Sequence, residues 1–179
     1  GEIHLGLESW PAGRAGDKAS VGLSASLSRL GLQLRRLKTG TPPRLDGRTV
    51  DLGTMQCQPG DEPPEPMSFL TGSIAAAQLP CWITWTNPGT HRIVRENLHL
   101  SPMHAGRIDA GGVRYCPSLE DKVVRFAERE RHQVFLEPEG RDDPTLYPNG
   151  ISTSLPAEVQ LRLVRSIPGL EKADMLQPG

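Results

Sequence analysis

The order of apolar and polar residues divides this chain into short strands, short helices and many turns. Strands are predicted where β-forming residues gather, at residues 3–7, 32–37, 79–86 and 133–136. Helices are predicted where apolar residues recur at helical spacing, over residues 20–30, 90–100 and 156–167 and from Pro117 onward. Strands and helices mix without an internal repeat, so the predicted fold class is α/β or α+β.

The helix that begins at Pro117 has the clearest end signals. Proline suits the first helical position, and this places Cys116 at the N-cap. Acidic residues follow in the first turn and basic residues come later, which matches the helix dipole. For the helix over residues 20–30, Ser20 is the expected N-cap and Gly31 the expected C′ residue.

Three segments between these elements are predicted to be loops or turns. The glycine and prolines of residues 38–44 exclude regular structure there. Residues 58–66 form an acidic, proline-rich loop, which is either a mobile lid or a plain surface connection. Residues 101–112 are rich in glycine and are also expected to be a loop.

Composition limits the classes of protein that this chain can belong to. Its 179 residues suffice for one domain, or for one domain and part of another, and a net charge of −1 means that any basic surface is local. Three widely spaced cysteines do not resemble a disulfide framework and fit a reducing compartment. No apolar run reaches the roughly 20 residues that span a bilayer, and no signal peptide is visible. Both ends are interpreted as cut from a longer protein.

Cys116 is the strongest candidate for chemistry. A thiol at a helix N-terminus, two residues from Arg114, is favoured as the reactive thiolate. The alternative is a small buried cysteine without a chemical role. Cys57 and Cys81 lack such surroundings and are expected to be structural.

A basic stretch is the second candidate site. Turns rich in glycine, threonine and arginine suit phosphate groups of a dinucleotide or of RNA. A solvated basic face is an equally good interpretation from charge alone. The stretch contains one acidic residue, Asp46, and six basic residues: Arg29, Arg35, Arg36, Lys38, Arg44 and Arg48.

Other patterns give weaker indications. The loop Ala12–Asp17 resembles a phosphate cradle but lacks the GxGxxG spacing. The five histidines show no HExxH pairing, so no metal site is predicted. Glu137 and Glu139 could form an acid–base pair, although a role in a turn is the expected one.

Several of these segments, taken in this order, resemble one family, MnmG/GidA, over essentially the whole chain. The strings that carry the resemblance are GEIHLGLES, AGRAGD, RLKTGTPPR, RYCPSLEDKVVRF, HQVFLEPEG and YPNGISTSLPAEVQ. The resemblance implies a flavoprotein that works with the GTPase MnmE. Together they place a carboxymethylaminomethyl or aminomethyl group on C5 of the wobble uridine (position 34) of tRNA.

The same resemblance implies cofactors, a fold and a location. FAD and NAD(H) are the expected cofactors, with methylenetetrahydrofolate as carbon donor and a homodimer as the assembly. The expected fold is part of a two-dinucleotide-binding-type FAD domain, residues 1–37 and 134–179, that carries an inserted α+β domain, residues 38–133. The protein is expected in the bacterial cytoplasm, or in mitochondria if its source is eukaryotic, and not in a membrane.

The resemblance also implies roles for particular residues. Cys116 matches a cysteine implicated in catalysis, which could add to C6 of the uracil ring or transfer a proton. Ser20 matches a position assigned to FAD, and Arg36, Lys38 and Arg44 match a basic surface suited to tRNA or dinucleotide phosphates. The stretch associated with NAD consists of Gly112, Val113, Arg114, Tyr115, Cys116, Pro117, Ser118, Leu119, Glu120, Asp121, Lys122, Val123, Val124, Arg125 and Phe126.

The chain lacks parts that the resemblance would require of an active enzyme. The GxGxxG that grips the FAD pyrophosphate would precede Gly1, and the MnmE-docking domain would follow Gly179. The 179 residues alone are therefore expected to bind FAD weakly or not at all and to be inactive. Two other functions remain open from the sequence: a non-catalytic module that binds NAD(H) or tRNA, and the related folate- and FAD-dependent tRNA uridine methyltransferase.

Overall fold

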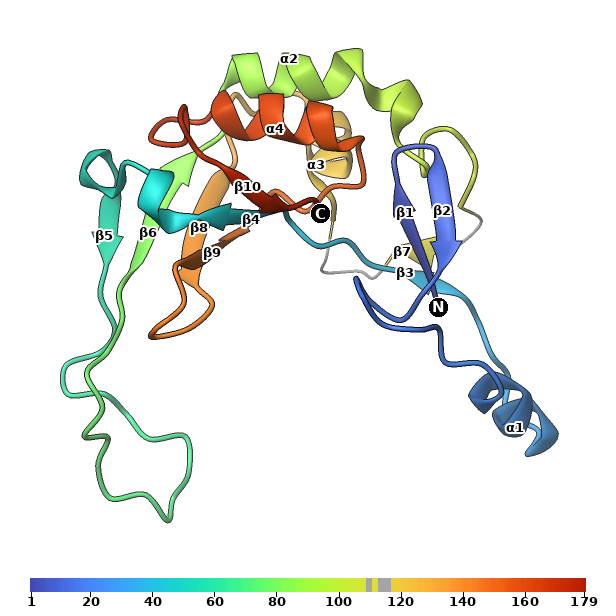
Figure 1. The fold of residues 1–179 in the computed structure, drawn as a ribbon, viewed down its shortest axis with the longest axis horizontal. Helices are drawn as coiled ribbons and strands as arrows, with labels where there is room; N and C mark the ends of the chain where they lie inside the picture. Colours follow the sequence, from blue (N-terminus) through green and yellow to red (C-terminus); the bar gives the residue numbers. More distant parts are fainter. Residues whose placement is uncertain (109–110, 113–116) are drawn as a thin grey trace.

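The computed structural model describes residues 1–108, 111–112 and 117–179. Within the described residues the largest unit is a six-stranded antiparallel sheet (Figure 1). Its strands are β4 (Arg44–Asp46), β5 (Gln56–Gln58), β6 (Cys81–Trp85), β8 (Gln133–Pro138), β9 (Thr145–Asn149) and β10 (Met175–Gln177). Their spatial order is β10-β4-β9-β8-β6-β5.

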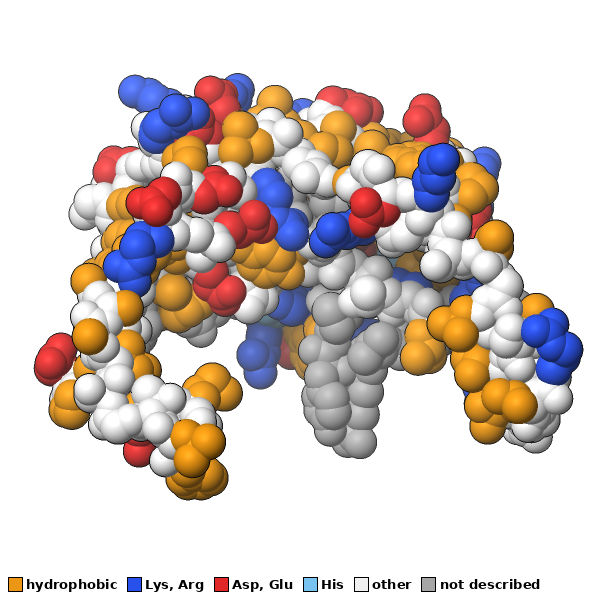
Figure 2. Space-filling model, turned by 60° about the horizontal axis from the view of Figure 1, so that its bottom comes forward, with side chains coloured by type: hydrophobic (Ala, Val, Ile, Leu, Met, Phe, Trp, Pro, Cys, Tyr) orange, Lys and Arg blue, Asp and Glu red, His pale blue; other side chains and the backbone are white. Residues whose placement is uncertain are grey.

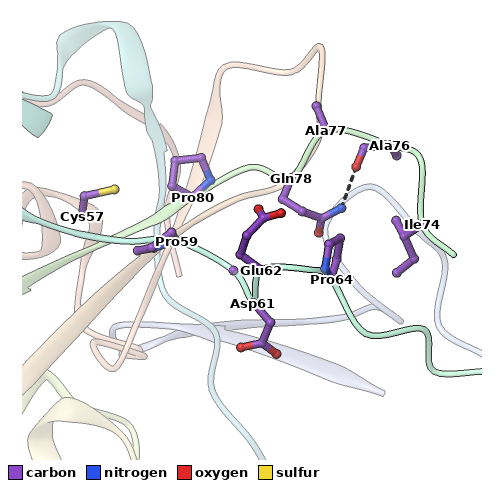
Figure 3. Close-up of a pocket in the computed structure, with 11 residues that line it drawn as sticks. Cys57, Pro59, Asp61, Glu62, Pro64, Ile74, Ala76, Ala77, Gln78 and Pro80 are labelled. Carbon is purple, nitrogen blue, oxygen red and sulfur yellow. Dashed lines mark hydrogen bonds between the residues drawn. The ribbon is translucent and has the colours of Figure 1, made fainter.

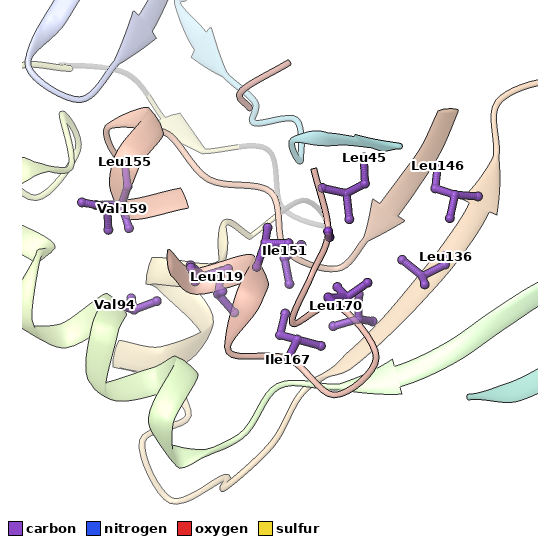
Figure 4. Packing of buried hydrophobic residues seen from close by; sticks show 14 of the residues in the cluster. Leu45, Val94, Leu119, Leu136, Leu146, Ile151, Leu155, Val159, Ile167 and Leu170 are labelled. Atoms are coloured by element: carbon purple, nitrogen blue, oxygen red, sulfur yellow. The ribbon is translucent and has the colours of Figure 1, made fainter. Parts of the chain in front are cut away.

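Three helices lie together on one side of this sheet (Figure 1). They are α2 (Pro88–Glu96), α3 (Leu119–Arg125) and α4 (Ala157–Arg165). Apolar side chains of the helices, of the strands and of the loops after β9 and α4 meet in one core (Figure 4). Fully buried members from these three sources include Leu45, Leu136, Val94, Leu119, Leu163, Ile151 and Leu170.

The remaining elements lie beside the sheet. A hairpin of β1 (Glu2–Leu5) and β2 (Glu8–Pro11) is followed by the short helix α1 (Leu23–Arg29). β3 (Leu37–Lys38) pairs in parallel with β7 (Gly111–Gly112). Short 3-10 helices cover Gly47–Thr49, Leu52–Thr54 and Leu98–Leu100.

One glycine fixes the turn after β9, on which α3 rests. Gly150 has a φ of 108°, and a Cβ added there would lie 2.5 Å from the carbonyl oxygen of Gln133. A side chain would therefore be strained by the backbone conformation and would collide with the neighbouring strand. This turn holds the carbonyl group that the Lys122 ammonium group contacts.

The structure confirms the mixed helix and sheet class and several predicted elements. Strands at residues 3–7, 79–86 and 133–136 and helices at 90–100 and 156–167 match β1, β6, β8, α2 and α4 within a few residues. The predicted strand at 32–37 is wrong, because residues 32–36 are not in a strand, and Leu37 alone of that range pairs with another strand among the described residues. Leu32 and Leu34 are exposed, so their alternation does not mark a buried face.

Two predicted helix starts are corrected. The first turn of α3 is capped by Ser118, whose side chain accepts the Asp121 N–H at 3.2 Å, so Cys116 is not the N-cap and Pro117 is not the first helical residue. α1 begins at Leu23 with Gly22 as N-cap, and Ser20 lies outside the helix. The sequence pattern also does not predict strands β2, β4, β5, β7, β9 and β10, and β7 lies at the end of the segment 101–112 that is predicted to be a loop.

The sheet draws strands from both sides of residue 133. β4, β5 and β6 come from the segment expected to be inserted, whereas nearly all of β8 and the whole of β9 and β10 come from the segment after it. Strand pairing and the hydrophobic core therefore run across residue 133 without a break. The division of the chain at residues 37 and 133 stays a prediction.

A pair of buried histidines joins α2 to the start of β8. His91 and His132 are 1% and 8% exposed, and their ring centroids are 5.1 Å apart. The hydroxyl of Thr86 lies 2.8 Å from Nε2 of His91 and accepts the backbone N–H of His132 at 2.8 Å. Burial lowers the pKa of both imidazoles. For His91, the positive charges of His132 and Arg95 lower the pKa further. For His132, those of Lys122 and Arg129 lower the pKa, and the negative charge of Glu128 raises it.

We expect the protein to lose stability as the pH falls below about 6.5, the pKa of histidine in an unfolded chain. Above that pH both histidines are neutral in both states. Below that pH the two histidines bind protons in the unfolded chain but not in the folded protein. The free energy of unfolding therefore falls by up to about 1.4 kcal/mol per pH unit for each histidine. The loss ends once the pH passes the lowered folded-state pKa values.

Urea unfolding at a series of pH values measures this slope. The double variant His91→Gln/His132→Gln should flatten the curve between pH 6.5 and 5. The matched control is His99→Gln/His104→Gln, because those two side chains are exposed and their loss should leave the slope unchanged. Equal slopes in the buried and the exposed variants would show that the buried pair does not govern the acid response.

Candidate functional site

The candidate site is a hollow of about 340 Å³ between the β1–β2 hairpin and the loop that follows Ser101. Polar and charged side chains dominate its lining. Two arginines from distant parts of the chain, Arg36 before β3 and Arg107 in the loop after Ser101, line it together. The full lining is Glu2, His4, Leu7, Ser9, Arg36, Arg107 and Ile108.

Arg36 is held at this hollow by one carboxylate. Its Nη1 donates to Oε2 of Glu2 at 3.2 Å, and His4 Nε2 lies 3.9 Å from the same oxygen. Hydrogen bonds from Ser9 and then from Arg36 lower the pKa of Glu2. The Arg36 side chain is still 67% exposed, so most of its N–H donors face solvent, where a phosphate could accept them.

Arg107 is the second cation of the hollow, and the sequence-based prediction missed it. Its Nη1 donates to the carbonyl oxygen of Leu7 at 3.1 Å, which ties the loop to the hairpin. The residue is exposed. No local motif marks Arg107, because it reaches Leu7 only when segments 100 residues apart meet.

Lys38 lies deeper than the prediction of an open basic surface implied. Its Nζ is 3.9 Å from Oδ2 of Asp121, and the two side chains are only 13% and 19% exposed. This ion pair connects β3 to the first turn of α3. Lys38 therefore has a structural partner already, while Arg36 faces solvent.

Arg44 is also engaged within the protein. Its Nε forms an ion pair with Glu139, and its Nη1 donates to the Thr41 hydroxyl at 2.9 Å and to the Pro42 carbonyl oxygen at 2.6 Å. Its guanidinium lies 4.4 Å from the centre of the Tyr147 ring. These contacts fix the turn before β4, so of the three predicted phosphate contacts Arg36 has the most freedom to meet a ligand.

The first turn of α3 is anchored firmly on the loop after β9. The Leu119 N–H donates to the Ser152 carbonyl oxygen at 2.7 Å, and Lys122 Nζ donates to the Gly150 carbonyl oxygen at 2.8 Å. Oε1 of Glu120 accepts the Thr153 hydroxyl at 2.9 Å. These bonds fix the position of the first turn of α3 on the loop after β9.

Glu120 is fully buried in this anchor. Its Oε1 also accepts the Ser154 N–H at 3.2 Å, whereas its Oε2 has no hydrogen-bond partner among the described residues. Thr153 in turn pairs with Thr41 of the turn before β4. One carboxylate thus couples α3 to the loop at 152–155, and through Thr153 to the turn at 39–43.

Some of the residues predicted to contact NAD are buried in the core, and others are exposed. Leu119, Glu120 and Val123 are buried in the protein, whereas Val124, Arg125 and Phe126 are exposed. Val113, Arg114, Tyr115 and Cys116 lie outside the described residues, so the structure does not test the role of the cysteine. Ser20, the predicted FAD contact, is exposed in the chain before α1.

The weaker sequence candidates receive structural explanations. Glu139 pairs with Arg44, and Glu137 accepts a hydrogen bond from the Asn149 side chain at 3.0 Å, so the two glutamates hold different neighbours rather than forming an acid–base pair. Burial raises the pKa of the Cys81 thiol, with further contributions from Glu137 and Cys57.

In the part of the chain that the structure describes, no group of three His, Cys, Asp or Glu residues could hold a metal ion. None of the described helices is long and apolar enough to cross a membrane.

Comparison with known proteins gives consistent matches over the whole chain. The profile of the family described as "Glucose inhibited division protein A" matches residues 1–179. A relative from Geobacter metallireducens, named tRNA uridine 5-carboxymethylaminomethyl modification enzyme MnmG, is 56% identical over 178 residues. That alignment covers 99% of this chain and 28% of the relative. A relative of the same name from Thermodesulfovibrio yellowstonii is 54% identical over 179 residues, which is all of this chain and 29% of the relative.

A solved structure matches as well. Aquifex aeolicus GidA in its form I crystal superposes with a TM-score of 0.87 at 49% identity, over 99% of this chain and 31% of that one. Sequence and three-dimensional arrangement therefore point to the same set of proteins. The chain spans less than a third of the length of each of these relatives.

Proposed function

The chain belongs to the Glucose inhibited division protein A family, and from this premise we propose that the complete protein that carries it modifies the wobble uridine of tRNA. The product would bear a carboxymethylaminomethyl or aminomethyl group at C5 of uridine 34. The observation that carries the proposal is the 56% identity, over nearly all of this chain, to a relative named for that modification. The shared name favours this function over the folate-dependent methyltransferase that the sequence alone left open.

The proposed cofactors are FAD and NAD(H), with methylenetetrahydrofolate as the carbon donor. A flavin, when bound, would supply the redox step between the carbon donor and the uridine. Within the described residues the fit is best for a phosphate, because exposed Arg36 and Arg107 line one hollow. We assign Ser20 to the FAD side and the exposed end of α3, from Val124 to Phe126, to the NAD(H) side.

Cys116 is the proposed catalytic residue. Its thiolate would add to C6 of the uracil ring, which moves electron density to C5 and makes that carbon a nucleophile. C5 would then form a bond to the electrophilic one-carbon unit derived from the carbon donor. Loss of the C5 proton and departure of the thiolate from C6 would restore the ring. Because Ser118 and not Cys116 caps α3, the argument for a thiolate depends on Arg114 nearby in sequence and no longer on the helix dipole.

The proposed partners are tRNA, the GTPase MnmE and a second copy of the protein. The phosphate backbone of tRNA suits the basic hollow, since guanidinium groups bind phosphate with paired hydrogen bonds. The cytoplasm is the proposed location, because the named relatives are bacterial and tRNA is found there.

The test of the proposal uses cells that lack the complete protein. Their tRNA should carry unmodified uridine 34 by mass spectrometry, and the wild-type gene should restore the modified nucleoside. The purified complete protein should also show flavin absorbance. Normal modification in the deleted cells would refute the proposed activity, and a colourless active protein would refute only the proposed flavin.

Charge reversal at Arg36 tests the proposed phosphate contact. We expect Arg36→Glu to weaken tRNA binding by the complete protein about tenfold at low salt and to reduce the slope of log K against log salt concentration by about 1. Arg36→Glu/Lys38→Glu should bind more weakly still and should also unfold at a lower temperature, because the carboxylate introduced in place of Lys38 would face Asp121.

The matched control for this prediction is Arg162→Glu, on α4, which makes the same change of charge away from the hollow. It should bind tRNA as the wild type does. If neither tRNA nor NADH binding changes in Arg36→Glu, the basic stretch is a solvated face without a ligand. Filter binding at several salt concentrations gives both the affinity and the slope.

A further inference from the structure

An arm of the chain, residues 59–80 between β5 and β6, projects away from the sheet (Figures 1 and 2). No residue from 57 to 79 is buried. Three large apolar side chains near the middle of the arm, Met67, Phe69 and Leu70, are 103%, 108% and 97% exposed. Large apolar side chains gathered on an open surface indicate that another polypeptide segment or another molecule covers it.

The base of the arm has a defined shape and a uniform charge. Arg141 Nη2 donates to the Ala77 carbonyl oxygen at 2.7 Å, which fastens the arm to the β8–β9 turn. A hollow of about 520 Å³ separates its two legs, and Asp61 and Glu62 line it (Figure 3). Between residues 58 and 80 the acidic residues are Asp61, Glu62 and Glu65, and there is no lysine or arginine.

The α1 segment, residues 20–37, is the second projecting part, and its charge is opposite. None of its residues is buried, and Val21, Leu23 and Leu30 are 88%, 67% and 76% exposed. It contains Arg29, Arg35 and Arg36 and no acidic residue. Apolar and basic side chains therefore share this surface (Figure 2).

The arm and the α1 segment project from the same side of the molecule at its opposite ends in both views (Figures 1 and 2). Within one copy they are apart, so neither covers the other. A two-fold axis between two copies facing each other on this side would bring each arm to the α1 segment of the other copy. Such a contact is made twice and closes the assembly at a dimer.

We propose that the arm of one copy docks on the α1 segment of a second copy. Met67, Phe69 and Leu70 would cover the exposed leucines of the α1 segment, and the acidic residues of the arm would face Arg29 and Arg35. The rest of a longer polypeptide could cover either apolar surface, but it does not account for the segregation of charge between them. The inference rests on the proposed self-association and is independent of the proposed chemistry.

Charge reversal in the complete protein tests this contact. We expect Glu62→Lys/Glu65→Lys to raise the dimer dissociation constant at least tenfold in analytical ultracentrifugation, and Arg29→Glu/Arg35→Glu to do the same. Combining all four substitutions should return the constant to within about threefold of the wild type, because opposite charges face each other again. The matched control, Glu158→Lys/Glu171→Lys, alters two exposed acids elsewhere and should leave the constant unchanged.

A photocrosslinking amino acid at Phe69 identifies the occupant directly. With two differently tagged copies mixed, the expected product joins one copy to residues 20–37 of the other. A crosslink within one copy, or to another segment, would overturn the proposal, as would a dimer that neither charge reversal weakens. A protein that is monomeric at all concentrations would refute the proposed self-association and this inference with it, while uridine modification would remain a separate measurement.

Discussion

Replacing Cys116 by serine is expected to abolish wobble-uridine modification, by more than about a hundredfold, while FAD remains bound to the complete protein. A serine hydroxyl stays protonated at neutral pH and is a poor nucleophile toward the uracil ring without a base beside it. The flavin would be unaffected, because the proposed FAD contact, Ser20, lies elsewhere in the chain. Mass spectrometry of tRNA and flavin absorbance of the purified variant measure the two effects.

Cys57→Ser is the matched control for the catalytic thiol. Cys57 is exposed on the edge strand β5, and its replacement should leave modification intact. Normal uridine modification in Cys116→Ser would remove the proposed catalytic role. Loss of flavin from that variant would instead indicate that Cys116 supports the cofactor site.

Replacing Glu120 by alanine is expected to destabilise the protein by about 2–4 kcal/mol. The substitution leaves the Thr153 hydroxyl and the Ser154 N–H without their acceptor and opens a cavity under α3. Because Glu120 is fully buried, water cannot easily replace the lost carboxylate oxygen. Denaturant unfolding of the complete protein measures the change.

Glu120→Gln is the comparison that isolates the hydrogen bonds from the volume. Its amide oxygen can accept the same two donors, so the expected change in unfolding free energy is within about 1 kcal/mol. If glutamine were as damaging as alanine, Oε2 would have an essential partner outside the described residues. If alanine were as mild as glutamine, the anchor of α3 would depend on packing instead of on this carboxylate.

Local sequence signals predict the elements whose apolar face is buried. In α4 the buried Val159, Leu163 and Val164 follow helical spacing, and β8 alternates buried Val134 and Leu136 with less buried neighbours. The prediction fails at Leu32 and Leu34, which are exposed and which pair with no strand in the described part of the chain. Helix α1 differs, because it is helical although Leu23 and Leu30 are exposed, so an apolar pattern does not by itself show whether a face is buried.

Strand β9 shows why some elements escape prediction. Pro148 argues against a strand, yet it lies opposite Leu136 in the middle of the sheet, between β4 and β8. The start of α3 is misplaced for a different reason. Pro117 suggests the first helical position, but the capping box of Ser118 and Asp121, which is also present in the sequence, sets the true start.

The sequence by itself determined the family of this protein, the helices with a buried stripe, and the position of one suspected thiol, Cys116. Only the tertiary structure decided which charged residues stay exposed and which are engaged by other side chains. Arg44 and Glu139 are 95 residues apart and Arg36 and Glu2 are 34 apart, so their pairing follows from the arrangement of strands and not from any local motif. The sequence shows how many charged residues there are, but folding decides which of them have an opposite charge within a few ångströms. In this fold Lys38 and Arg44 are engaged by acidic side chains, whereas Arg36 and Arg107 stay exposed.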